Sequence, residues 1–198
     1  MGKRKLEKAM SLYRERHPGG PQPAVRWLPF QLNPDLPEAG IPREEYVARK
    51  FGARGKGVNE RVTMAGRQVG ILFAYEKMKV QPNTLKAHRL LLYAERAGKQ
   101  DALAEELFRA HFTEGANLTD TKTLAGIAER AGLDRKATAD YLAGDAGRDQ
   151  IAQAEVEARS AGIGGVPFFI FNRKHGVSGA QDPEALLEAM EQALNSSD

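Results

Sequence analysis

Apolar residues recur at helical spacing along most of this chain. Between Lys3 and His17 they form one stripe that ends before Pro18, which predicts an amphipathic helix. Similar patterns separated by turn residues predict further helices over residues 43–51, 59–69, 83–97, 100–113, 120–131, 134–143, 148–161 and 183–194. The stretch from Ile71 to Tyr75 fits either a helix end or an extended piece. The chain is therefore expected to be mainly helical.

Two short runs have the composition of β-strands instead. Residues 166–171 are apolar, and most are β-branched or aromatic, which is typical of a strand buried on both faces. Residues 24–32 form a second candidate, bent or ended near Pro29. Residues 175–178 can return beside the first run as a hairpin partner. Helix and strand at the start, a long helical stretch, and then a strand pair and a helix predict an α/β sandwich.

A proline near the start of the first run is unusual. Because Pro167 has no N–H, it loses no ladder bond only where that side of the strand faces no neighbouring strand. The residue therefore marks a sheet edge or a place where another backbone or a ligand docks. Base rates alone favour a trans peptide bond before it.

Composition limits the classes of function. The 198 residues suit one domain, or one domain with an insertion, and 29 Lys and Arg are interleaved with 26 Asp and Glu. This balance argues against a nucleic-acid partner. No apolar run approaches the roughly 20 residues that a membrane span needs, so we expect no membrane partner and a cytoplasmic protein. The chain has no cysteine, which excludes disulfides, thiolate metal sites and cysteine nucleophiles within it.

The first helix begins without a cap. Neither Met1 nor Gly2 offers a side-chain oxygen, and Lys3, Arg4 and Lys5 place positive charge at the positive end of the helix dipole. A negative or polar group is therefore expected upstream of Met1. The alternative is a frayed first turn, which tolerates basic residues at little cost.

Six motifs occur in a specific order and spacing along the chain. They are GKRKLEK at residues 2–8, WLPFQLNP at 27–34, PNTLKAHRLL at 82–91, LFRAHFTEG at 107–115, GVPFF at 165–169 and VSGAQ at 177–181. Together they resemble the FrnE-type branch of the DsbA family, whose superfamily includes 2-hydroxychromene-2-carboxylate isomerases and kappa-class glutathione transferases. The resemblance implies an α/β fold, with a thioredoxin-like sheet and an inserted all-helical domain. Residues 1–34 and 162–198 would form the thioredoxin-like domain, and residues 35–161 the helical insertion.

The resemblance also implies what this sequence lacks. In the family a central strand leads into a Cys-x-x-Cys or related turn at the start of the first helix, and this chain begins just after the matching point. We therefore expect the family cysteines and the first, central strand to lie upstream of Met1. Two alternatives are a partner chain that supplies the strand, and closure of the two remaining strands onto each other. As given, the chain is expected to be an incomplete or redox-inactive thiol-disulfide oxidoreductase, with no catalytic residue of its own.

Binding residues follow from the resemblance, position by position. Pro167 corresponds to a cis-proline, and Val166 before it, with Gly165, would bind the backbone of a thiol- or disulfide-containing peptide or small molecule. Further contacts with substrate or glutathione are expected from Asn83, His88, Ala180 and Gln181. Helix capping is a sufficient alternative explanation for Asn83. For His88, and likewise for His111, the alternative is an ordinary packed or solvated position.

Two other functions stay open. One is a glutathione-dependent isomerase or transferase of the 2-hydroxychromene-2-carboxylate isomerase or kappa type, with glutathione as substrate or co-substrate. At the start of the last helix, however, this chain has Asp182 in place of the serine and basic residue of the transferase pattern. The other is a non-catalytic peptide-binding or chaperone-like module that pairs as a homodimer. We expect no cofactor and no metal, and the basic, glycine-rich loop Gly52–Gly57 lacks the spacing of a phosphate-binding loop.

Overall fold

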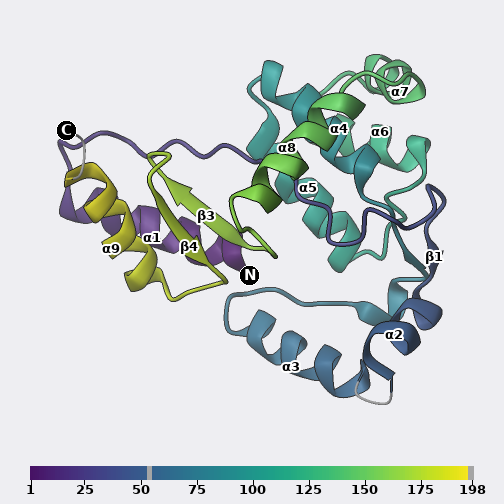
Figure 1. The fold of residues 1–198 in the computed structure, drawn as a ribbon, viewed down its shortest axis with the longest axis horizontal. Helices are drawn as coiled ribbons and strands as arrows, with labels where there is room; N and C mark the ends of the chain where they lie inside the picture. Colours follow the sequence, from purple (N-terminus) through teal and green to yellow (C-terminus); the bar gives the residue numbers. More distant parts are fainter. Residues whose placement is uncertain (53–54, 196–198) are drawn as a thin grey trace.

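The computed structural model describes residues 1–52 and 55–195, and helices dominate it (Figure 1). The helices are α1 (Gly2–Arg16), α2 (Arg43–Phe51), α3 (Gly55–Arg67), α4 (Leu85–Arg96), α5 (Gln100–Phe112), α6 (Thr121–Arg130), α7 (Arg135–Ala143), α8 (Arg148–Ser160) and α9 (Pro183–Asn195). The strands are β1 (Ile41–Pro42), β2 (Val80–Gln81), β3 (Phe168–Phe171) and β4 (His175–Ser178). β1 pairs with β2 and β3 with β4, both antiparallel. The described residues thus form a helix-rich α/β fold with small sheets.

Most helices lie close to their predicted bounds, and two of them begin at recognisable caps. Asp120 accepts the backbone N–H of Thr123 at the start of α6, and Asp134 accepts that of Ala137 at the start of α7. α2 spans the predicted residues 43–51. Local sequence was a sufficient guide for these elements.

Helix α3 departs from the prediction. It begins at Gly55, inside the expected loop Gly52–Gly57, of which residues 53–54 lie outside the described residues. Gly55 is buried against Val47 of α2, so this contact offsets the low helix propensity of glycine. The ambiguous stretch that begins at Ile71 has no regular secondary structure before it enters a short 3₁₀ helix, η2 (Tyr75–Lys77).

The two ends of the chain build one end of the molecule, here called the hairpin lobe. α1 and α9 lie side by side against the β3–β4 hairpin (Figure 1). Their shared core consists of Ala9, Tyr13, Leu186, Leu187 and Met190. Phe169, Phe171 and Val177 of the hairpin pack against this core, whereas Ile170 points to the other face and is 47% exposed.

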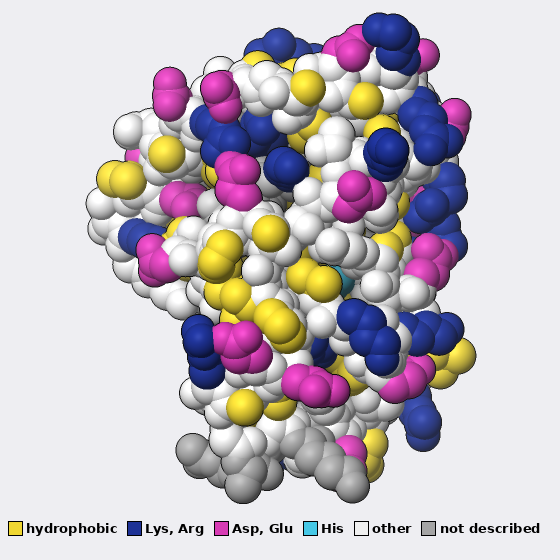
Figure 2. Space-filling model, turned by 90° about the vertical axis from the view of Figure 1, so that its right-hand side faces the viewer, with side chains coloured by type: hydrophobic (Ala, Val, Ile, Leu, Met, Phe, Trp, Pro, Cys, Tyr) yellow, Lys and Arg dark blue, Asp and Glu magenta, His cyan; other side chains and the backbone are white. Residues whose placement is uncertain are grey.

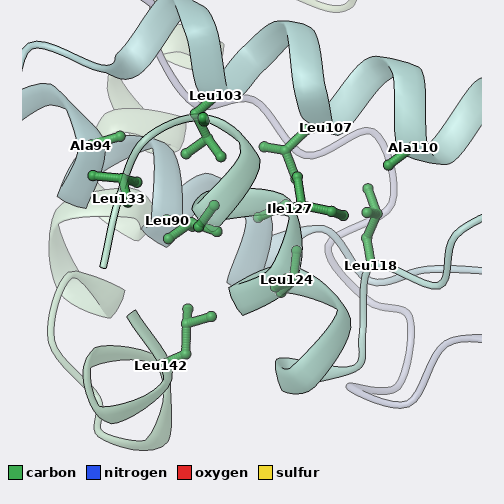
Figure 3. Packing of buried hydrophobic residues seen from close by; sticks show 13 residues of the cluster. Leu90, Ala94, Leu103, Leu107, Ala110, Leu118, Leu124, Ile127, Leu133 and Leu142 are labelled. Carbon is green, nitrogen blue, oxygen red and sulfur yellow. The ribbon is translucent and has the colours of Figure 1, made fainter. Parts of the chain in front are cut away.

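Helices α4 to α8 form the other end, here called the helical lobe. Figure 3 shows its core, in which leucines from several helices gather around Ile127. The fully buried members include Leu90, Leu103 and Leu124. This core shares no residue with the core of the hairpin lobe.

A buried arginine ties α4 to the end of α7. Arg89 is fully buried, and it donates hydrogen bonds to backbone carbonyls of Tyr141, Leu142, Gly144 and Ala146. These carbonyls lie at the C-terminal end of α7, where the helix dipole favours a cation. Arg89 therefore has a structural role in the helical lobe.

The predicted second strand, residues 24–32, pairs with no strand among the described residues. Its backbone is held by side chains of the helical lobe instead. The side-chain amide of Gln100 accepts the N–H of Trp27 at 2.9 Å and donates to the carbonyl of Trp27 at 3.0 Å. The strand prediction was wrong because a helix side chain, not a neighbouring backbone, satisfies these groups.

Helix α8 holds the same segment at a second point. Glu155 accepts the N–H of Gln31 at 2.7 Å, and Arg159 donates to its carbonyl at 2.9 Å. The Arg159 guanidinium also lies 4.6 Å from the centre of the Phe30 ring. The segment thus crosses from one lobe to the other as an extended strap.

The surface carries charges of both signs. On the face in Figure 2, basic side chains are scattered over the molecule with acidic side chains between them. No helix in residues 1–52 and 55–195 is long and apolar enough to span a membrane.

Candidate functional site

The start of α1 lies directly against Pro167. Gly2 is buried there, and a Cβ atom added to it would lie 2.8 Å from Cγ and 2.9 Å from Cβ of Pro167. A side chain at this position would therefore force the proline loop away from the helix. The Val166–Pro167 peptide bond is cis, and Val166 is 50% exposed beside the helix start. The predicted binding residues Gly165, Val166 and Pro167 thus lie on the loop that faces the first turn of α1.

Carboxylates surround the basic first turn of α1. Lys3 lies 3.2 Å from a carboxylate oxygen of Glu105 and 3.4 Å from one of Asp101, both on α5, and it also contacts Glu7. Arg4 pairs with Glu105 and with Glu7. The basic side chains of this turn are therefore paired with carboxylates of α1 itself and of the helical lobe, while the start of α1 has no side-chain cap.

These ion pairs change the pKa values of their members. Burial disfavours the charge on Lys3, but hydrogen bonds to Glu7 and Glu105 and the nearby Asp101 outweigh it and raise its pKa. Burial likewise favours neutral Glu105, but hydrogen bonds from Arg4 and Lys3 lower its pKa below the usual value. The first turn of α1 is thus a neutralised charge cluster.

The turn before α9 completes the surroundings of Pro167. Gly179 donates its N–H to the carbonyl of Pro167 at 2.9 Å. Lys5 of α1 donates to the carbonyl of Ala180 at 2.9 Å and pairs with Asp182 at 2.8 Å. Among the predicted contact residues, Ala180 and the adjacent Gln181 therefore lie near Val166 and Pro167.

Asn83 has a structural role in a different place. Its side chain accepts the N–H of Leu85 at 2.9 Å, and it bonds the Gln31 side chain and the carbonyl of Leu36 at 3.1 Å and 2.7 Å. The first bond is a local turn of the backbone onto Asn83, whereas the N-cap residue of α4 is Thr84, which makes no side-chain capping bond. None of these contacts reaches Val166.

The two helical histidines are packed in the helical lobe. Burial lowers the pKa of His88 to about 4, and a hydrogen bond with the Phe30 backbone opposes this shift. The buried Nδ1 of His88 has no hydrogen-bond partner within residues 1–52 and 55–195. His111 bonds the carbonyl of Ala116 through Nδ1 at 3.2 Å, and burial lowers its pKa as well. Among the described residues, no hydrogen bond or ring contact joins either histidine to the Pro167 loop.

Asp101 and Glu105 were not predicted as site residues. These residues lie four apart on α5, so they share one face of that helix. Their spacing was visible in the sequence, but it did not indicate that this face meets α1. Among the described residues, no three His, Asp or Glu side chains are grouped so that they could hold a metal ion.

The chain is similar to known proteins in sequence and in fold. The DSBA-like thioredoxin domain matches residues 1–191. The chain belongs to this family. Its structure is also similar to that of a probable DsbA oxidoreductase from Streptomyces coelicolor, with a TM-score of 0.88 and 28% identity. That similarity covers 100% of this chain and 85% of the other. No curated protein sequence matches the chain.

The arrangement around Pro167 lies within the region that matches the DSBA-like family. The helix start, the proline loop and the turn before α9 come from opposite ends of the chain and meet at one point. The family relation supports an oxidoreductase-type fold, although no residue of this chain can provide a thiol, because it contains no cysteine.

Proposed function

We propose that these 198 residues form the substrate-positioning part of a FrnE-like thiol-disulfide oxidoreductase. The chain would bind the backbone of a thiol- or disulfide-containing peptide at Val166 and Pro167. It would not exchange disulfides itself, because exchange needs an attacking thiolate and this chain has no cysteine. The close approach of Gly2 to Pro167 is the observation that carries this proposal.

The chemistry of the site suits this role. An exposed backbone beside a strand can pair with a peptide backbone, and Val166, two residues before β3, is 50% exposed. A sulfur held beside Val166 would lie near the start of α1, where backbone N–H groups and the helix dipole favour a thiolate. The sulfur must come from a bound partner, and a cysteine-free chain is compatible with the reducing cytoplasm.

Glutathione fits the turn before α9 less well. The γ-glutamyl carboxylate would meet Asp182 there, and the nearby cation, Lys5, is already paired with Asp182 and with the carbonyl of Ala180. We therefore favour a peptide over glutathione. A glutathione-dependent enzyme should gain thermal stability when glutathione is added, and we expect no such gain here.

Two assays test the proposal. In the first, dithiothreitol reduces insulin with and without the protein, and we expect the same rate in both. In the second, fluorescence anisotropy follows a labelled hexapeptide with one cysteine, and we expect binding. A protein that accelerates insulin reduction would contradict the proposed chemistry, and a peptide that fails to bind would contradict the positioning role.

The variant Gly2→Ala tests where the peptide binds. Its new Cβ would clash with Pro167, so the loop must shift, and we expect affinity to fall by about tenfold. Gly126→Ala on α6 is the matched control, because a Cβ there meets nothing within 4 Å. Equal peptide affinity in both variants would show that the peptide does not bind at the Pro167 loop.

A further inference from the structure

Two ion pairs lie beside the Pro167 loop, one on each side of the start of α1. Lys3 pairs with Asp101 of α5 at 3.4 Å, and Lys5 pairs with Asp182 of the turn before α9 at 2.8 Å. Residues two apart in a helix are separated by about 200° around its axis. The two carboxylates therefore lie on opposite sides of the helix start, which is marked N in Figure 1 and lies between the hairpin and the helical lobe.

In both pairs the cation is covered and the carboxylate is exposed. The side chains of Lys3 and Lys5 are 10% and 24% exposed, whereas those of Asp101 and Asp182 are 57% and 80% exposed. Each pair is neutral as a whole, but carboxylate oxygens form the part of it that an approaching molecule contacts. The site is therefore flanked by acidic surface on two sides.

The third side-chain cation of this turn, Arg4, does not reverse the sign. Its guanidinium is shared between the carboxylates of Glu7 and Glu105. The three cations of the turn are thus matched by four carboxylates, namely Glu7, Asp101, Glu105 and Asp182.

The side next to α5 also offers an aromatic surface. Asp101 accepts the indole N–H of Trp27 at 3.0 Å, and the Trp27 ring lies edge-to-face with the ring of Phe108 at 5.7 Å between centres. Phe108 is partly exposed. A planar guanidinium can stack on an aromatic ring while it bonds a neighbouring carboxylate. This side of the site therefore fits an arginine side chain better than an uncharged one.

We propose that the peptide bound at Val166 and Pro167 carries basic residues, arginine above all, on both sides of its cysteine. A peptide whose cysteine lies beside Val166 crosses the start of α1, so its flanking side chains extend toward Asp101 in one direction and toward Asp182 in the other. Complementary charge speeds the association of basic peptides and disfavours acidic ones. The peptide must bind at Val166 for this selection to operate, so the inference rests on the proposed function.

Three labelled hexapeptides test the selection. They differ only in the residues on either side of the cysteine, which are arginine, glutamine or glutamate. In fluorescence anisotropy at about 0.01 M salt, we expect the arginine peptide to bind at least about tenfold more tightly than the glutamate peptide, with the glutamine peptide between them. The difference should shrink at about 1 M salt, where charges are screened within about 3 Å. Equal affinities of the three peptides would overturn the inference and leave the proposed function intact, whereas no binding by any of them would overturn both.

Two protein variants locate the selection. Asp101→Asn and Asp182→Asn remove a charge and keep the size of the side chain. Each should weaken binding of the arginine peptide by about two- to fivefold and leave the glutamine peptide unchanged. Asp140→Asn on α7 is the matched control, because Asp140 is exposed and also pairs with a lysine, Lys136, at 2.7 Å. An equal loss in the control would mean that only the total charge of the protein matters, and it would overturn the inference.

A reversal of charge gives a readout that partial unfolding cannot imitate. In the double variant Asp101→Lys with Asp182→Lys, the glutamate peptide should bind more tightly than the arginine peptide. Circular dichroism checks that the variant folds. A folded double variant that still prefers arginine would overturn the inference.

Discussion

At the scale of single residues, His88 makes stability depend on pH. Its folded-state pKa is about 4, below the ordinary 6.5, chiefly because burial penalises the charged ring. Between these values the unfolded chain binds more protons than the folded chain, so the free energy of unfolding falls as pH falls through this window. The full loss approaches about 3 kcal/mol. Urea unfolding at a series of pH values between 7 and 4 measures it.

The variant His88→Leu isolates this contribution. Acidic groups elsewhere also affect the pH dependence, but they are common to both proteins, so the difference between the two curves belongs to His88. We expect the variant to have a flatter curve. His17→Leu is the control, since His17 is exposed and pairs with Glu191 on the surface. A His88→Leu protein with the slope of the parent would show that folding does not lower the pKa of His88.

Some residues of the candidate site could be predicted from the sequence, and others could not. Val166 and Pro167 were singled out from their own motif, and the structure adds that Gly2 packs against that loop. Asp101 and Glu105 could not be found in the same way. Many exposed carboxylates share a helix face in this sequence, and only tertiary packing decides which face meets Lys3 and Arg4.

At the scale of elements, the strap depends on Gln100. The variant Gln100→Leu would remove both hydrogen bonds to the Trp27 backbone. The unpaired N–H and carbonyl should lower the free energy of unfolding by about 1–3 kcal/mol. Trp27 is the only tryptophan of the chain, so a red shift of its fluorescence reports loss of the strap directly. Gln153→Leu is the control, because Gln153 is exposed on α8 and bonds only Glu157 among the described residues. An unchanged spectrum in Gln100→Leu would mean that other contacts hold the strap.

The elements themselves were predictable to different degrees. Helix bounds followed from apolar spacing and from caps such as Asp120 and Asp134, which act locally. β3 and β4 followed from their composition and short turn. The strap has the composition of a strand, but a strand requires a partner, and composition carries no information about whether one is present. The strap is instead bonded by helix side chains that are distant in sequence, since Trp27 and Gln100 are more than 70 positions apart.

At the scale of the whole molecule, the two lobes have separate cores and polar contacts between them. The contacts between the lobes include the pair Arg4–Glu105, and the strap adds Gln100 and Glu155. Ion pairs with exposed members contribute only about 0–1 kcal/mol each, less than a buried leucine. The lobes are therefore expected to open separately before the protein unfolds globally.

Two leucine truncations test this expectation by native-state amide hydrogen exchange. Leu186 and Leu124 are both fully buried, one in each core. In Leu186→Ala, the opening free energy of amides in α9 should fall by about 2–5 kcal/mol, the usual cost of a buried leucine, while amides in α5 and α6 change by much less. Leu124→Ala should give the reverse pattern and serves as the matched control. A uniform loss over both lobes in either variant would mean that the polar contacts couple them into one cooperative unit. In that case the strap, which the helical lobe holds at Trp27 and Gln31, would be the element to test next as the source of the coupling.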